Sequence, residues 1–128
     1  MNPRAIRVLH VDDNDDARTL LSILLEQEED LEEVGSLHNA EGLTVLIRAT
    51  GPDVLVIDLI MPGRDPIEAI QEAREVAPDL RIVAFSGTVD PQLLSRARQA
   101  GASQVVRKTC DVYETLDVIR GRSRPSAQ

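Results

Sequence analysis

One stretch near the middle of the chain, residues 54–63, limits the fold more than any other. Its first four residues, Val-Leu-Val-Ile, are all apolar, and three of them are β-branched. Such a run is typical of a strand buried on both faces, as in the middle of a parallel sheet covered by helices. The strand ends at Asp58, and a carboxylate is costly at the edge of an apolar core unless its charge is used. Asp58 is therefore a candidate functional residue, with a capping or turn aspartate as the alternative.

Strand and helix patterns alternate along the whole chain. Strands are expected at residues 6–11, 33–37, 54–57, 81–85 and 104–107. Apolar residues at helical spacing follow each strand, and helices are expected to begin at Asn14 or Asp15, near Asn39 and at Asp90. Strict alternation predicts a five-stranded parallel sheet with helices on both faces, the flavodoxin-like doubly wound (βα)5 fold.

Composition limits the domain count and the class of partner. A chain of 128 residues with 42% hydrophobic residues forms one domain, which we place at 1–120. Residues 121–128 have linker composition and are expected to be a C-terminal tail or the start of a linker. The net charge of −8 argues against direct nucleic-acid binding and against an anionic membrane surface. One cysteine excludes internal disulfides, and the lack of a long apolar run predicts a soluble, cytoplasmic protein.

Polar side chains stand where the predicted strands end. Because ligands of open α/β sheets bind outside the carboxyl ends of the strands, these side chains are expected to lie together around one binding site at that edge of the sheet. They are Asp12, Asp13, Asp58, Ser86 and Lys108.

The chemistry open to this set is narrow. Three carboxylates within about 4 to 6 Å repel one another, and raised pKa values or a divalent cation relieve that repulsion. An all-oxygen site suits Mg²⁺. With the metal present, Asp58 can act as a nucleophile toward a phosphoryl group, while Lys108 and Ser86 supply a cation and a hydroxyl donor for the phosphoryl oxygens.

The same residues closely resemble the receiver domain of two-component response regulators. The resemblance covers about residues 5 to 120 and rests on Val11-Asp12-Asp13-Asn14, Asp58-Leu59-Ile60-Met61-Pro62-Gly63, Ser86-Gly87, Ala100-Gly101-Ala102 and Lys108. It implies that Asp58 is the phosphoacceptor and that Asp12 and Asp13 bind Mg²⁺ together with Asp58 and the backbone carbonyl of Ile60. It also implies that Ser86 is the switch hydroxyl and Lys108 the phosphoryl-binding lysine.

Three positions depart from the family pattern. Thr109 follows the lysine where the family usually has proline, so a trans peptide is expected there. Val105 occupies the position of the family's switch aromatic, so signalling must depend on Ser86 and loop movement. Pro66 stands where glycine is common, and proline suits the first turn of a helix.

The resemblance also implies partners and a function. We expect a phosphoacceptor switch with self-catalysed phosphoryl transfer, and we do not expect an enzyme. The switch would receive its phosphoryl group from a sensor histidine kinase or phosphotransfer protein. It would control an output domain or partner protein, with transcription regulation and a phosphorylation-dependent dimer as open possibilities. The apolar Ile60 predicts slow autodephosphorylation, because it cannot orient an attacking water. A non-catalytic receiver-like docking module is the alternative.

Two other features are expected to be structural. His10 lies inside the first strand, and we expect it to be packed in the core. The acidic run over residues 26–33 has no partner nearby in the sequence, so we interpret it as a solvated helix end and loop.

Overall fold

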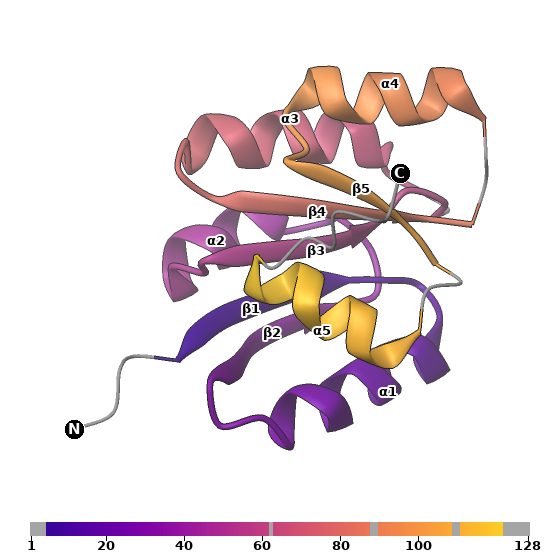
Figure 1. Cartoon of the computed structure of the whole chain (residues 1–128). Coiled ribbons are helices and arrows are strands. Elements are labelled where there is room, and N and C mark those ends of the chain that lie inside the picture. Colours follow the sequence, from indigo (N-terminus) through magenta and orange to yellow (C-terminus); the bar gives the residue numbers. More distant parts are fainter. Residues whose placement is uncertain (1–4, 62, 88–89, 109–110, 122–128) are drawn as a thin grey trace.

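The predicted strands form one parallel sheet in the order β2-β1-β3-β4-β5 (Figure 1). This computed structural model describes residues 5–61, 63–87, 90–108 and 111–121. The strands are β1 (Ile6–Val11), β2 (Leu31–Leu37), β3 (Val54–Asp58), β4 (Arg81–Ser86) and β5 (Gln104–Arg107). The helices are α1 (Asp15–Glu26), α2 (Leu43–Thr50), α3 (Pro66–Val76), α4 (Pro91–Ala100) and α5 (Val112–Arg120). The flavodoxin-like (βα)5 fold is confirmed.

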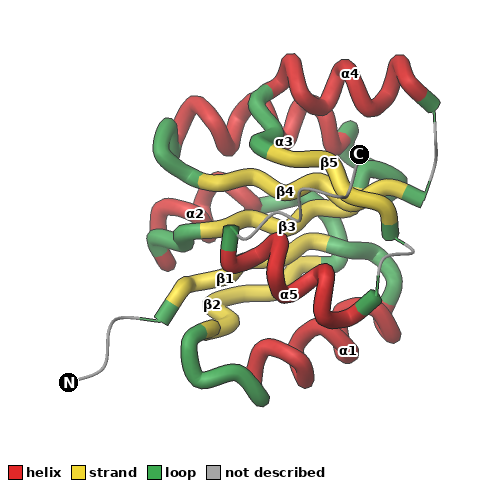
Figure 2. The backbone as a smooth tube through the Cα atoms, viewed as in Figure 1, coloured by secondary structure: helices red, strands yellow, loops and turns green. Residues whose placement is uncertain are grey.

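The helices cover the sheet in two layers (Figure 2). Side chains of α2, α3 and α4 pack with one face of the sheet, and those of α1 and α5 pack with the other. The central strand β3 supplies both cores, because Leu55 and Ile57 face the first layer while Val54 and Val56 face the second. All five of its residues are buried, as the apolar run predicts.

Helix caps explain several element boundaries. Asn14 caps α1, since its side chain accepts a hydrogen bond from the Ala17 N–H at 2.9 Å. Asp65 and Asp90 cap α3 and α4 in the same way, and in both helices proline occupies the first turn. These caps determine the residues at which α1, α3 and α4 begin after the loops at the carboxyl end of the sheet.

Two predicted boundaries were wrong. β2 begins at Leu31, two residues before the predicted strand, and α2 begins at Leu43, not near Asn39. The Asn39 side chain accepts from the Glu41 N–H at 2.8 Å and so forms a local turn. Gly42 then adopts φ +75°, a left-handed conformation that no helix interior contains.

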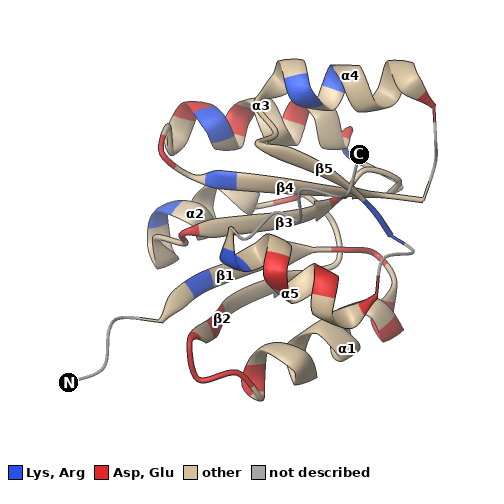
Figure 3. Ribbon diagram, viewed as in Figure 1, with Lys and Arg blue, Asp and Glu red and all other residues tan. Residues whose placement is uncertain are grey.

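The acidic run is also different from the prediction, because most of it has partners from distant segments. Arg120, in the last turn of α5, pairs with Glu28 at 2.6 Å and with Asp30 at 2.6 Å. Glu33 accepts from the Ser22 hydroxyl at 2.6 Å and contacts Nε2 of the buried His10. Glu28 and Asp30 lie in the turn between α1 and β2, where Figure 3 shows acidic residues at the end of the sheet opposite the carboxyl ends of the strands, whereas Glu33 lies within β2. His10 itself is packed in the core, as predicted.

Some predictions fall on residues outside the described ranges. They concern Pro62, Thr109 and the tail at 122–128, and they stay predictions. Within the described residues, no helix is long and apolar enough to cross a membrane.

Candidate phosphoacceptor site

Parallel strand ends bring the candidate residues to one edge of the sheet. Asp58 is the last residue of β3 and Ser86 the last of β4, while Asp12 follows β1 and Lys108 follows β5. β1 and β3 are neighbours in the sheet although α1, β2 and α2 separate them in sequence. This adjacency places the two aspartates side by side at the point where the strand order reverses.

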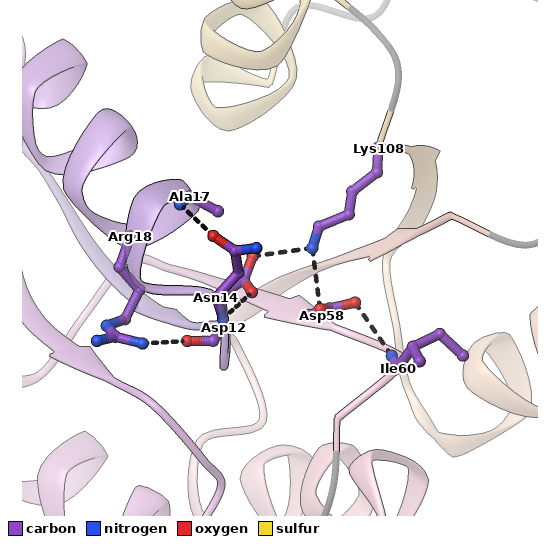
Figure 4. A network of polar contacts seen from close by, with 7 residues as sticks. All are labelled: Asp12, Asn14, Ala17, Arg18, Asp58, Ile60 and Lys108. Carbon is purple, nitrogen blue, oxygen red and sulfur yellow. Dashed lines mark hydrogen bonds and ion pairs between the residues drawn. The ribbon is translucent and has the colours of Figure 1, made fainter.

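Asp58 is the most buried carboxylate of the group, with only 4% of its surface exposed. Its Oδ1 accepts a hydrogen bond from the Ile60 N–H at 3.0 Å, and its Oδ2 accepts one from Lys108 Nζ at 3.0 Å (Figure 4). Burial raises the pKa of Asp58, and the Ile60 N–H and the Lys108 ammonium only partly offset that rise. The carboxylate is thus oriented through both oxygens and is poor in solvation, which suits a nucleophile.

Lys108 bridges two carboxylates. Its Nζ lies 3.1 Å from Asp12 Oδ2 as well as 3.0 Å from Asp58 Oδ2. Burial opposes its charge, but the hydrogen bonds and charges of Asp58 and Asp12 raise the pKa of Lys108 above its ordinary value. The lysine therefore stays protonated and partly neutralises the site.

Asp12 is held by its own loop. Its Oδ1 accepts from the Asn14 N–H at 3.0 Å, and its backbone carbonyl accepts from Arg18 Nη1 at 2.8 Å. Arg18 also pairs with Asp15, one helical turn before it. Arg18 is a residue of this site that its sequence pattern does not indicate. The spacing of Asp15 and Arg18 indicates a helix-surface pair. The contact between Arg18 and the Asp12 carbonyl depends on the direction of α1 relative to the loop that precedes it.

The carboxylates fit a hard divalent cation. Oxygen atoms of Asp12, Asp13 and Asp58 lie within 4.8 Å of one another, and they range from buried Asp58 to exposed Asp13. An open pocket beside them includes Asp13, Asp58, Ile60 and Lys108 in its lining. All-oxygen donors with room for water are the ligands that Mg²⁺ prefers.

Ser86 reaches the same edge but takes a different position. It is buried, and its backbone carbonyl accepts a hydrogen bond from the Lys108 N–H at 3.0 Å. Gly87, the next residue, contributes to the lining of the open pocket. The structure therefore brings Asp12, Asp13, Asp58 and Lys108 into one cluster and connects Ser86 to that cluster through the backbone.

The departures from the family pattern have simple structural positions. Val105 is half-buried in β5 and packs against the core layer of α2, α3 and α4. Pro66 occupies the first turn of α3, directly after the Asp65 cap, as its residue type predicts.

This geometry defines a class: doubly wound α/β domains that carry an acidic, lysine-bridged site at the carboxyl ends of their parallel strands. The response regulator receiver domain matches residues 8–120, and the chain belongs to this family.

Individual relatives agree with that assignment. The transcriptional regulatory protein LiaR of Bacillus subtilis is 32% identical over 93% of this chain, which spans 56% of the length of LiaR. The response regulator domain of Thermotoga maritima CheB is 26% identical, with a TM-score of 0.82 over 93% of this chain and 96% of that domain. A two-component response regulator of the LuxR family from Aurantimonas is 30% identical, with a TM-score of 0.80 over 93% of this chain and 88% of that one.

Proposed function

We propose that this receiver domain accepts a phosphoryl group on Asp58 and changes conformation to control an output domain or a partner protein. The observation that carries the proposal is the double anchoring of Asp58, whose two oxygens bind the Ile60 N–H and the Lys108 ammonium at 3.0 Å each. A capping or turn aspartate needs only local backbone donors. A lysine from another strand end indicates that the charge of Asp58 is used.

In the proposed reaction, an Asp58 oxygen forms a bond to the phosphorus atom of a phosphohistidine. The phosphorus–nitrogen bond breaks, and its electron pair returns to the imidazole nitrogen, which takes a proton from water. Asp12, Asp13, Asp58 and the backbone carbonyl of Ile60 would hold Mg²⁺, which supplies positive charge that offsets the repulsion between carboxylates and phosphoryl oxygens. Lys108 would exchange its carboxylate contact for a phosphoryl oxygen, and the Ser86 hydroxyl would donate to another.

Conformational signalling would then pass through β4 and β5. The Ser86 carbonyl and the Lys108 N–H are hydrogen-bonded, so movement of either residue toward the phosphoryl group displaces the other strand end. Val105 offers no aromatic ring to rotate, and the proposed switch therefore depends on Ser86, Lys108 and their loops.

The proposed donor is a sensor histidine kinase or a phosphotransfer protein of the cytoplasm. The relative LiaR is named a transcriptional regulatory protein, and this chain spans only 56% of its length. We therefore propose transcription regulation through an output domain, with no direct nucleic-acid contact by this domain. A phosphorylation-dependent dimer is a further part of the proposal.

Intact mass spectrometry after incubation with acetyl phosphate tests the phosphoacceptor role. Wild type should gain one phosphoryl group in the presence of Mg²⁺ and almost none in the presence of a chelator. Asp58→Ala should gain none, whereas Asp79→Ala, which removes an exposed aspartate between α3 and β4, should behave as wild type. Labelling that survives Asp58→Ala would overturn the proposal, and a folded wild type that is never labelled would favour the non-catalytic docking module.

A further inference from the structure

A cavity of about 170 Å³ lies between α1 and α5, on the face of the sheet opposite α2, α3 and α4. Its walls include Ala17, Leu21 and Leu24 from α1 and Val112 and Thr115 from α5, and Phe85 of β4 contributes to its lining. The open pocket beside Asp13 and Ile60 is separate from it, although both reach Asp58 and Lys108.

The cavity has a compositional cause. Aromatic residues make up only 2% of the chain, and Phe85 is its single phenylalanine. Ala17 and Val112, on opposite walls, are too short to fill the space between the two helices. Because these walls are mostly apolar, an apolar group is favoured there over water.

The polar end of the cavity determines what kind of head group fits. Asp12, Asp58 and Lys108 all contribute to its lining. Two carboxylates facing one ammonium leave a net negative charge, and each carboxylate oxygen can accept more than one hydrogen bond. His10, which also lines the cavity, directs its Nε2 to Glu33. A positively charged N–H donor is therefore favoured over an anionic group.

We propose that this cavity binds a small primary amine with a compact apolar body, the ring lying between α1 and α5 and the ammonium donating to Asp12 and Asp58. The size agrees with a single ring, since an apolar cavity of about 150 Å³ is enough to bind benzene. The ammonium occupies the same carboxylates that fit a divalent cation, so the amine and Mg²⁺ compete. If Asp58 is phosphorylated as proposed above, the amine is an inhibitor of that reaction, but its binding does not depend on phosphorylation.

Three probes separate the contributions of the head and the body. NMR titration of the labelled wild-type domain, without phosphodonor and at constant pH and ionic strength, would use benzylamine, methylamine and benzyl alcohol. Benzylamine should give saturable shifts of the Leu21, Leu24 and Val112 methyl groups. Methylamine lacks the ring and benzyl alcohol lacks the charge, so each should bind at least about tenfold more weakly. Added Mg²⁺ should raise the apparent Kd of benzylamine.

Two variants test the location. Ala17→Phe fills the cavity and should weaken benzylamine binding by about tenfold or more. Val45→Phe places the same ring on the exposed surface of α2 and should leave binding unchanged. If Ala17→Phe does not fold, Val112→Phe can fill the cavity from the opposite wall. The competition between Mg²⁺ and benzylamine needs no variant, because it is measured on wild type.

The result that overturns the proposal is the absence of saturable benzylamine shifts at millimolar concentration. If methylamine binds as tightly as benzylamine, the binding is only a contact with the acidic cluster, and the proposal is also overturned. Unchanged benzylamine binding after the cavity is filled, with Mg²⁺-induced shifts that show an intact fold, would exclude this location. A domain that binds benzylamine but is not labelled by acetyl phosphate would keep this proposal and refute the phosphoacceptor function, so the two failures are distinguishable.

Discussion

Replacement of Lys108 by methionine removes the ammonium that bridges two carboxylates but keeps a side chain of similar shape. Lys108 Nζ lies 3.0 Å from Asp58 Oδ2 and 3.1 Å from Asp12 Oδ2. At 3.0 Å, one unit charge pair contributes about 5.5 kcal/mol at an effective dielectric constant of 20 and about 1.4 kcal/mol in bulk water. The Lys108 side chain is 33% exposed, so screening favours the lower figure, and removing the ammonium also removes its desolvation cost. We expect Lys108→Met to lower the free energy of unfolding by about 1 to 3 kcal/mol at neutral pH without Mg²⁺.

The loss should depend on pH in a defined direction. The folded-state pKa of Asp58 is raised above the ordinary value of 3.8, so protonated Asp58 favours the folded state. That stabilisation is complete below the ordinary pKa and is lost as the pH rises through the folded-state pKa. Without Lys108 the folded-state pKa rises further, because a hydrogen bond and a positive charge are removed. The deficit of the variant should therefore be largest at neutral pH and shrink as Asp58 becomes protonated.

Urea unfolding over a pH series, at low salt and with a chelator, measures this deficit. Arg107→Met is the matched control, since Arg107 is an exposed cation next in sequence to Lys108. Equal free energies of unfolding for the two variants at neutral pH would refute this role of Lys108, and so would a deficit of Lys108→Met that grows on acidification. Mg²⁺ should still bind the variant, because the carboxylates remain.

Three further predictions concern metal binding, lifetime and packing. Millimolar Mg²⁺ should raise the melting temperature of wild type in a thermal-shift assay, because a cation that binds only the native state stabilises that state. Asp13→Ala should reduce this rise while the metal-free melting temperature changes little. Equal rises for wild type and Asp13→Ala would contradict the metal site. Ile60→Asn should shorten the lifetime of the phosphorylated form, because the exposed Ile60 side chain cannot orient water and asparagine can. The measurement is the decay of the phosphorylated mass over time. Decay that is no faster than in wild type would show that Ile60 does not control water access. Leu25→Ala should cost about 2 to 5 kcal/mol in urea unfolding because Leu25 is fully buried, whereas Leu20→Ala, at a side chain that is 53% exposed, should cost clearly less; similar costs would contradict the packing.

The order of elements was predictable because it depends on local patterns. The apolar run before Asp58 specifies a strand buried on both faces, and it occupies the centre of the sheet. Caps such as Asn14 and Asp90 act within three residues, so the sequence alone identifies them. The turn at Asn39 was missed because an asparagine can cap a helix or form a turn with its own backbone, and the choice depends on Gly42.

The site was partly predictable for a topological reason. In a parallel sheet every strand ends at the same edge, so residues after different strands must approach one another whatever their separation in sequence. The shared edge of the sheet accounts for the closeness of Asp12, Asp13, Asp58 and Lys108 in space. It does not determine the bridging position of Lys108 between two carboxylates or the buried position of Ser86, because side-chain direction is set by the loops and by packing.

Only the tertiary structure decided which distant charges meet. The acidic residues between α1 and β2 are isolated in sequence, yet Arg120 at the end of α5 pairs with Glu28 and Asp30 because both helices cover the same face of the sheet. The cavity between α1 and α5 has the same origin. Local pattern shows that each helix has an apolar face, but whether two such faces fill the space between them depends on the distance and the side chains that the fold brings together.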